Sequence, residues 1–326
     1  MLVKAVFKVN LQFGNPRSYE QAIKTFNHKL ENLYKGEACI KHESFDEATF
    51  SLSVPNLVVT TLEKTIKNTA YILDDLARFA SSGKGYCWII NEGKASFSHY
   101  SEPTESKSVI VSFLKGRQLA REAGREQEAI QELTAAVEKF DAHWTAFERR
   151  GYVYGLIGEF DNAMADFNSS IAINPGQADA YFSRARVSML KKDYDSAIAD
   201  FDTTWKNANP QMPLYWSARR VKAECCLTQG KFAEAAQELK FFTKQKFSEE
   251  NSNYPWRKSA WLNYSRALHE TKMEKEAKEA FKTAFAIKDN LEPIIEGDLL
   301  VFCNYMSARC GVKIPAEAPA GSLVMA

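Results

Sequence analysis

Apolar and polar residues alternate at the start of the chain and then follow longer periods. Every second position from residue 3 to residue 13 is apolar, which gives an extended strand one apolar face. Apolar residues next recur at three- and four-residue steps over Pro16–Tyr34 and Thr60–Ser81, the spacing that lines one side of a helix. Short runs predict four further strands, at Glu37–His42, Thr49–Val54, Gly85–Asn91 and Lys94–Tyr100.

These segments predict a small α+β domain over residues 1–107, with the order β-α-β-β-α-β-β and both helices on one face of the sheet. The last two strands form a hairpin, and residues 101–108 are a polar linker. If Val3–Phe13 lies at a sheet edge, its unpaired backbone gives the chain a route to a homo-oligomer through the N-terminal sheet.

The rest of the chain repeats itself. Residues 144–177 and 178–211 are both 34 long and align without a gap, with Gly151 opposite Ala185 and Phe160 opposite Tyr194. Less regular copies lie upstream, around Gly124, and downstream. The small residue lets two helices approach closely and the aromatic residue fills the turn between them. One such hairpin cannot bury its own apolar face, so neighbours must stack.

This pattern resembles the tetratricopeptide repeat (TPR) family, whose unit is a 34-residue helix–turn–helix. The resemblance covers about residues 110–291, as four repeats and a fifth that has lost the mid-repeat glycine and aromatic residue. The first repeat has Arg117 where the family has a small residue, so its first helix is expected to pack less closely. A capping helix is expected over residues 293–311. The expected domains are thus 1–107, 108–311 and a flexible tail, 312–326.

The resemblance implies an all-α superhelix, or α-solenoid, whose concave groove is lined by the first helix of each repeat and binds a protein or peptide. By alignment, every repeat places a basic residue there. The candidate partner-binding residues are Lys115, Arg121, Arg149, Tyr152, Arg186, Arg220 and Arg266. The arginines suit an acidic peptide, a C-terminal carboxylate or a phosphorylated segment, because a guanidinium binds such groups with two bonds. Alternatively, they pair with nearby acids such as Glu148, Glu224 and Glu270.

Family members that bind the acidic tails of heat-shock chaperones use a clamp of Lys, Asn and Arg side chains. The corresponding positions here hold Leu114, Gln118, Arg149, Asp179 and Ser183. The clamp is not reproduced, so this resemblance does not extend to chaperone tails.

Composition narrows the function further. Lys and Arg total 42 against 41 for Asp and Glu, so no global basic field favours nucleic acid. No run of 18 apolar residues predicts a membrane span, and no apolar core predicts a signal peptide. The 6 cysteines form no CxxC pair and are expected to be free thiols in the cytoplasm.

No motif in the sequence predicts catalysis, a metal site or a cofactor. Cys39 and His42 have metal-ligand spacing but lack a second pair of ligands. Gly83–Gly85 lacks the flanking residues of a phosphate-binding loop, and Ser81 with Lys84 lacks the other motifs of a serine nucleophile.

A non-catalytic interaction scaffold is therefore the leading hypothesis. In a second hypothesis, the N-terminal domain is an enzyme or ligand sensor, with Lys41, His42, Asp74 and His99 converging on a pocket. A third is RNA binding, with Tyr152 and Trp144 stacking on bases.

Overall fold

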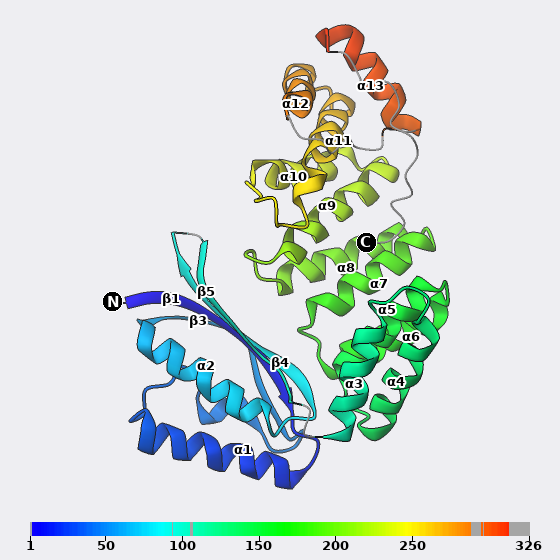
Figure 1. Ribbon diagram of the computed structural model, residues 1–326. Helices are drawn as coiled ribbons and strands as arrows, with labels where there is room; N and C mark the ends of the chain where they lie inside the picture. Colours follow the sequence, from blue (N-terminus) through cyan, green and yellow to red (C-terminus); the bar gives the residue numbers. More distant parts are fainter. Residues whose placement is uncertain (1, 93, 105–106, 288–294, 296, 313–326) are drawn as a thin grey trace. The chain divides into compact units, whose positions relative to one another are not determined.

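The computed structural model describes residues 2–92, 94–104, 107–287, 295 and 297–312 (Figure 1). Contacts between residues divide the chain into two compact units, Met1–Ala180 and Tyr181–Ala326, and each is described by itself. The tail expected over 312–326 lies outside the described residues, apart from Val312.

The first unit begins with a five-stranded antiparallel sheet. Its first strand, β1 (Leu2–Gln12), lies between β3 (Ser51–Leu62) and β4 (Ser82–Asn91), with β2 (Phe45–Asp46) outside β3 and β5 (Lys94–Ser101) outside β4. The first strand is thus central and hydrogen-bonded along both sides. The hypothesis that this strand offers a free edge is therefore wrong.

The edge of this sheet is formed by β5 on one side and by most of β3 on the other. The short strand β2 pairs only with Ser51 and Leu52 of β3. Residues 53–62 carry no charged side chain, and Val58 is 52% exposed. Charged side chains and prolines on an edge strand normally discourage pairing with another strand, and this stretch has only Pro55 of these.

Two helices, α1 (Pro16–His28) and α2 (Glu63–Ala77), cover one face of the sheet (Figure 1). The first begins where the Asn15 side chain accepts the backbone N–H of Ser18, with Pro16 in the first turn. The alternate apolar residues of β1 are buried beneath these helices, where they form one core with Phe26 of α1 and Leu73 of α2. The predicted order β-α-β-β-α-β-β, with both helices on one face, is confirmed.

Two segments differ from the sequence prediction, and the second strand of the predicted order lies at Phe45–Asp46. Glu37–His42 is not a strand: Ile40 is buried in the core, and the Cys39 N–H bonds to the Thr69 hydroxyl instead of a neighbouring strand. The residues from Thr60 to Leu62 extend β3 rather than starting the helix. Their apolar spacing fits both structures, and pairing with β1 decides between them.

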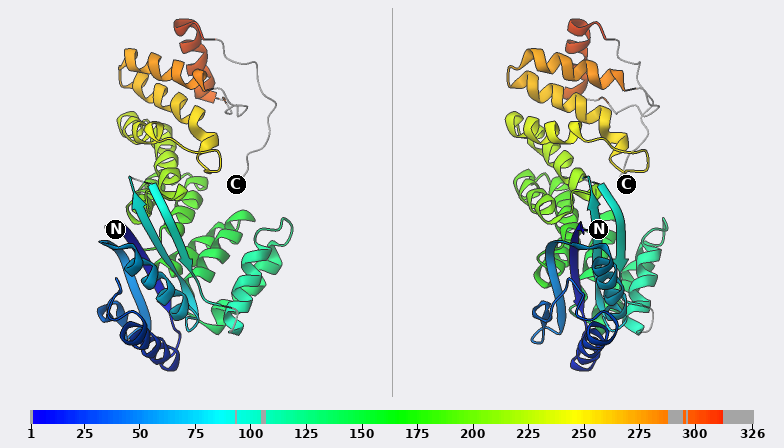
Figure 2. Two further views of the ribbon diagram at one scale, coloured as in Figure 1. Left: turned by 60° about the vertical axis from the view of Figure 1, so that its left-hand side comes forward. Right: turned by 90° about the vertical axis from the view of Figure 1, so that its left-hand side faces the viewer.

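Helices follow the sheet as antiparallel hairpins (Figure 2). They are α3 (Ser108–Leu119), α4 (Glu126–Lys139), α5 (Trp144–Leu156), α6 (Phe160–Ile173), α7 (Ala178–Leu190), α8 (Tyr194–Asn207), α9 (Pro213–Thr228), α10 (Phe232–Lys244), α11 (Arg257–Glu270), α12 (Glu274–Ala286) and α13 (Gly297–Cys310). Consecutive hairpins touch where α4 meets α5, α8 meets α9 and α10 meets α11. The expected helical solenoid is thus confirmed, and α13 buries Phe302 and Met306 against the last hairpin.

Small residues stand where the two helices of a hairpin approach most closely. A Cβ on Gly151 would lie 2.9 Å from the Phe167 ring, and one on Gly116 would lie 2.6 Å from the Leu133 side chain. In the first hairpin the small residue is thus Gly116, so the prediction that Arg117 occupies this position is wrong. The turn between α3 and α4 is longer than the turn after α5, which shifts the alignment by one residue.

The residue just before each of these small positions is a cation that binds an acid on the second helix of the same hairpin. Arg150 makes two hydrogen bonds of 2.8 Å to the Asp166 carboxylate, and Arg184 makes two of 2.7 Å to Asp200. The equivalent pairs in two other hairpins are Lys115 with Glu132 and Lys222 with Glu238. These cations therefore hold hairpins together.

Candidate functional site

The sheet packs against the helical hairpins within the first unit. The Trp144 indole at the start of α5 donates a hydrogen bond of 3.1 Å to Asn10 of β1, and the Lys8 ammonium donates one of 2.7 Å to the Gly176 carbonyl. These contacts use the sheet face opposite α1 and α2. The sheet thus covers part of the surface near α5.

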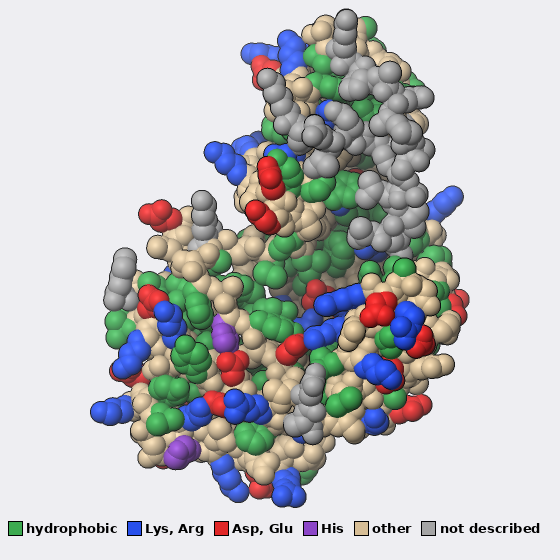
Figure 3. Space-filling model, in the orientation of Figure 1, with side chains coloured by type: hydrophobic (Ala, Val, Ile, Leu, Met, Phe, Trp, Pro, Cys, Tyr) green, Lys and Arg blue, Asp and Glu red, His purple; other side chains and the backbone are tan. Residues whose placement is uncertain are grey.

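A pocket of about 330 Å³ remains between the sheet and the helices α3 and α5. We call it the sheet–repeat pocket. Strand β4 contributes Lys84, and the helical side contributes Arg117, Arg121 and Arg149. Two acids, Glu102 and Glu148, also line it, so cations outnumber acids by four to two. Basic and acidic side chains gather at this place in the space-filling view (Figure 3).

Glu102 and Arg117 form the closest ion pair of the pocket. The guanidinium donates hydrogen bonds of 2.7 and 3.2 Å to the two carboxylate oxygens, and the Tyr100 hydroxyl donates one of 2.8 Å. Burial works to raise the pKa of the Glu102 carboxyl, but the bonds from Arg117 and Tyr100 outweigh it, and the pKa lies below its usual value. Glu102 is therefore a carboxylate at neutral pH.

The other three cations are held less completely. The Arg149 guanidinium lies 3.8 Å from Glu148 and over the Tyr152 ring, 5.4 Å from its centroid. The Lys84 ammonium lies 3.7 Å from Asp179. The Arg121 side chain is exposed and makes no ion pair within the described part of the chain. The pocket therefore has spare capacity for an anion.

The remaining sequence-predicted site residues lie elsewhere. Lys115 on α3 pairs with Glu132 of α4, outside the pocket. In the second unit, Arg186 is half-buried on α7 and Arg266 pairs with Asp298 at 3.0 Å. Arg220 is 7% exposed and pairs with Glu224 at 2.5 Å. The structure thus brings together Arg121 and Arg149, with Tyr152 beneath the latter.

The loop between α10 and α11 explains why Arg220 is buried. Asn253 in this loop accepts a hydrogen bond from Ser217 and donates one to the Pro213 carbonyl, both at 2.9 Å. The Trp256 ring then lies 4.0 Å from the Arg220 guanidinium. Because the loop covers this part of α9, the Arg220 side chain is buried and packs against the Trp256 ring.

Comparison with known families identifies the hairpins. Residues 118–178 and 191–240 match one family model of the tetratricopeptide repeat, and residues 259–291 match another. The matched hairpins are tetratricopeptide repeats. No family matches the sheet, and no curated protein matches the sequence.

Solved structures resemble the chain in fold alone. A crystal structure of MamA protein covers 55% of this chain and 91% of its own, with 16% identity and a TM-score of 0.46. A structure described as a Podosopora anserina putative kinesin light chain with nearly identical TPR-like repeats covers 56% and 96%, with 17% identity and a TM-score of 0.45.

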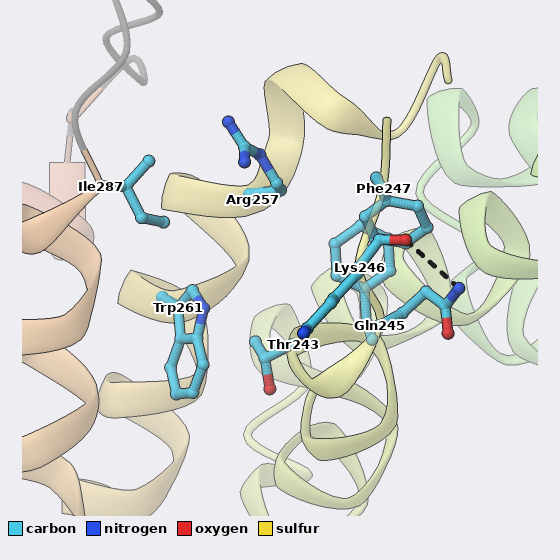
Figure 4. Close-up of a pocket in the computed structure, with 8 residues that line it drawn as sticks. Thr243, Gln245, Lys246, Phe247, Arg257, Trp261 and Ile287 are labelled. Carbon is cyan, nitrogen blue, oxygen red and sulfur yellow. Dashed lines mark hydrogen bonds between the residues drawn. The ribbon is translucent and has the colours of Figure 1, made fainter. Parts of the chain in front are cut away.

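A second pocket, of about 380 Å³, lies among the later repeats (Figure 4). It is lined by Phe242, Thr243, Gln245, Lys246, Phe247, Arg257, Trp261 and Ile287. The Gln245 amide donates a hydrogen bond of 3.4 Å to the Lys246 carbonyl at its rim. The loop after α10 therefore shapes this pocket too.

Of the residues named for an enzymatic N-terminal domain, Asp74 and His99 come together, but His42 does not join them. His99 and Ser101 both bond to the Asp74 carboxylate, at 2.9 and 2.7 Å, on the helix-covered face. His42 instead packs on Phe26, with ring centroids 5.3 Å apart. Nor can Trp144 stack on a base, because it is 3% exposed and bonded to Asn10.

Among the described residues, no cluster of His, Cys, Asp or Glu could hold a metal ion. Likewise, no helix in the described ranges is long and apolar enough to cross a membrane.

Sequence reasoning missed three charged residues of the sheet–repeat pocket, Lys84, Glu102 and Arg117. Aligning the first repeat on Gly116 would have placed Arg117 opposite Tyr152, so a signal for Arg117 existed. Lys84 and Glu102 reach the pocket only because the sheet packs on α3 and α5, and no periodicity reports such a contact.

Proposed function

We propose that the protein is a non-catalytic interaction scaffold, in which the sheet–repeat pocket binds an acidic segment of a partner protein. The tetratricopeptide repeats support the scaffold role. The excess of cations in the pocket is the observation on which the acidic partner depends, because the whole chain has a net charge of only +1. Arg121 and Arg149 are the proposed contact residues, with Tyr152 positioning Arg149.

Arginine gives this site its chemistry. A guanidinium stays charged at all relevant pH values and can donate two parallel hydrogen bonds to one carboxylate. Because the Arg121 side chain is exposed, its guanidinium stays hydrated and carries little desolvation cost until a ligand binds. Arg117, near the end of α3 and four residues before Arg121, shows this geometry with Glu102.

Selection from a library of random peptides tests the proposal. We expect peptides rich in Asp and Glu to be selected by the full chain. Arg121→Ala should weaken their binding by about 10- to 100-fold, since hydrogen bonds to charged groups contribute about 1.5–3 kcal/mol. Lys115→Ala is the control: it also removes one positive charge from the first hairpin, but outside the pocket. Equal affinities of the two variants would refute the proposal.

We further propose that the sheet (residues 1–107) and the repeats (residues 108–311) are distinct modules of the protein. We also propose a cytoplasmic location. All six cysteines are free thiols, as a reducing compartment requires.

We also propose that the protein self-associates through the N-terminal sheet. The pairing edge is then β3, because the first strand lies inside the sheet. The uncharged stretch 53–62 would pair with its copy without charge repulsion. Sedimentation of the wild type and of Val58→Lys tests it: the wild type should dimerise and the variant should not. A wild type that stays monomeric at high concentration would exclude it.

A further inference from the structure

The sheet–repeat pocket already contains a carboxylate from its own chain. Glu102 follows directly after β5, in the segment that leads from the sheet to the repeats. Its two oxygens accept the paired hydrogen bonds from Arg117, and the side chain is 30% exposed. This arrangement is the one that a carboxylate of a bound peptide would adopt on an arginine.

The charges around Glu102 differ in how well they are neutralised. Arg117 makes two hydrogen bonds to Glu102, of 2.7 and 3.2 Å, whereas Arg149 and Lys84 lie 3.8 and 3.7 Å from their acids. An incoming acidic segment would therefore meet Arg121, Arg149 and Lys84 first. Glu102 stands beside them with a negative charge and holds the fourth cation.

The Glu102–Arg117 pair is open enough to be exchanged. Arg117 is 25% exposed, so water can hydrate either group when the pair separates. Separating the pair breaks its two hydrogen bonds, and a carboxylate of the ligand can replace both of them on Arg117. The Tyr100 hydroxyl is then released as well, and the ligand's carboxylate can accept its hydrogen bond.

We infer that Glu102 is a resident competitor: a tethered carboxylate that occupies Arg117 and that an acidic partner segment displaces. The inference rests on the proposed function and adds the regulation of its site. It also assigns a role to the sheet, which supplies Lys84, Tyr100 and Glu102 to a pocket whose arginines come from the repeats. The sheet thereby sets how tightly the repeats bind acids.

Removing the resident carboxylate should strengthen binding. The probe is a fluorescein-labelled hexapeptide of alternating Asp and Glu, titrated into the full chain and followed by anisotropy. Glu102→Gln keeps the side chain's size and an oxygen for Tyr100, so we expect the fold to persist and the peptide to bind about tenfold more tightly, as close charge pairs at interfaces permit. Glu122→Gln, which removes an acid outside the pocket, should change the affinity less than twofold. An affinity that is unchanged or reduced in E102Q would overturn the inference.

A double-mutant cycle separates competition from a general field effect. If Glu102 acts by holding Arg117, the gain from E102Q should disappear in the R117A background. A gain of the same size in both backgrounds would mean that only the negative charge matters, and would overturn the inference. Thermal unfolding of all variants checks that each is folded.

A parallel titration with a small acid separates a failure of the proposed function from a failure of this inference. Citrate, a small tricarboxylate, is titrated in parallel. If citrate alone binds and gains affinity in E102Q, Glu102 is a competitor in a site for small acids, so the inference stands and the peptide function fails. If the hexapeptide binds, needs Arg121 and is indifferent to Glu102, the function stands and the inference fails.

Discussion

At the scale of single residues, His143 shows how burial sets chemistry near the pocket. Its ring is fully buried at the start of α5, where Nδ1 accepts the Ala146 N–H at 3.2 Å. Because Nδ1 is an acceptor, Nε2 carries the proton, and it has no partner within the described residues. Desolvation lowers the pKa of His143 from 6.5 to about 3. The side chain is therefore neutral in the folded protein.

This lowered pKa predicts a loss of stability in mild acid. The unfolded chain binds a proton at His143 below pH 6.5 and the folded chain does not, so the stability is present above 6.5 and is lost as the pH falls towards 3. This one group should cost about 2 kcal/mol of unfolding free energy between pH 7 and pH 5.

Urea unfolding at the two pH values measures this loss. His143→Asn, which can still cap α5, should lose about 2 kcal/mol less than the wild type between pH 7 and pH 5. His28→Asn replaces an exposed histidine at the end of α1 and is the control. Equal pH dependence in all three proteins would contradict the assignment.

At the scale of the element, each repeat depends on one small residue. A methyl group at Gly151 would stand 2.9 and 3.0 Å from atoms of the Phe167 ring and 3.1 Å from the Ala163 carbonyl. The ring is 1% exposed, so it has no room to move away. The two helices of the hairpin would have to separate.

We expect Gly151→Ala to lower the unfolding free energy by about 1–3 kcal/mol, although alanine favours helices. Gly176→Ala is the matched control, because the nearest atom to its Cβ is 3.6 Å away. Urea denaturation compares the two variants. A Gly151→Ala protein as stable as the wild type would show that α5 and α6 do not pack this closely.

The sequence predicted the helices, strands and repeats better than it predicted the pocket. Alternation and helical spacing gave the order of the sheet domain, and the 34-residue period located the repeats, because both patterns follow from burying one face. The strand predicted over Glu37–His42 was wrong because Ile40 is buried without any strand pairing. Arg117 was misplaced because a longer turn shifted the register by one residue.

At the scale of the whole molecule, long-range packing decides the site. Lys84 and Glu102 are far in sequence from Arg149, and only the docking of the sheet on α5 brings them to one pocket. Arg220 and Arg266 have the same alignment support as Arg149, but Glu224, Trp256 and Asp298 surround them. A repeat alignment ranks these arginines equally because it contains no information on what covers them.

The central claim is that the arginines of the first repeats, completed by the sheet, bind acidic segments. Side-chain Nε–Hε NMR signals of arginine, recorded while the acidic hexapeptide is added to the full chain, test it most directly. The signals of Arg117, Arg121 and Arg149 should shift together and saturate at one peptide concentration. Shifts confined to arginines of the second unit, such as Arg257 in the other pocket, or no shifts at all, would contradict it.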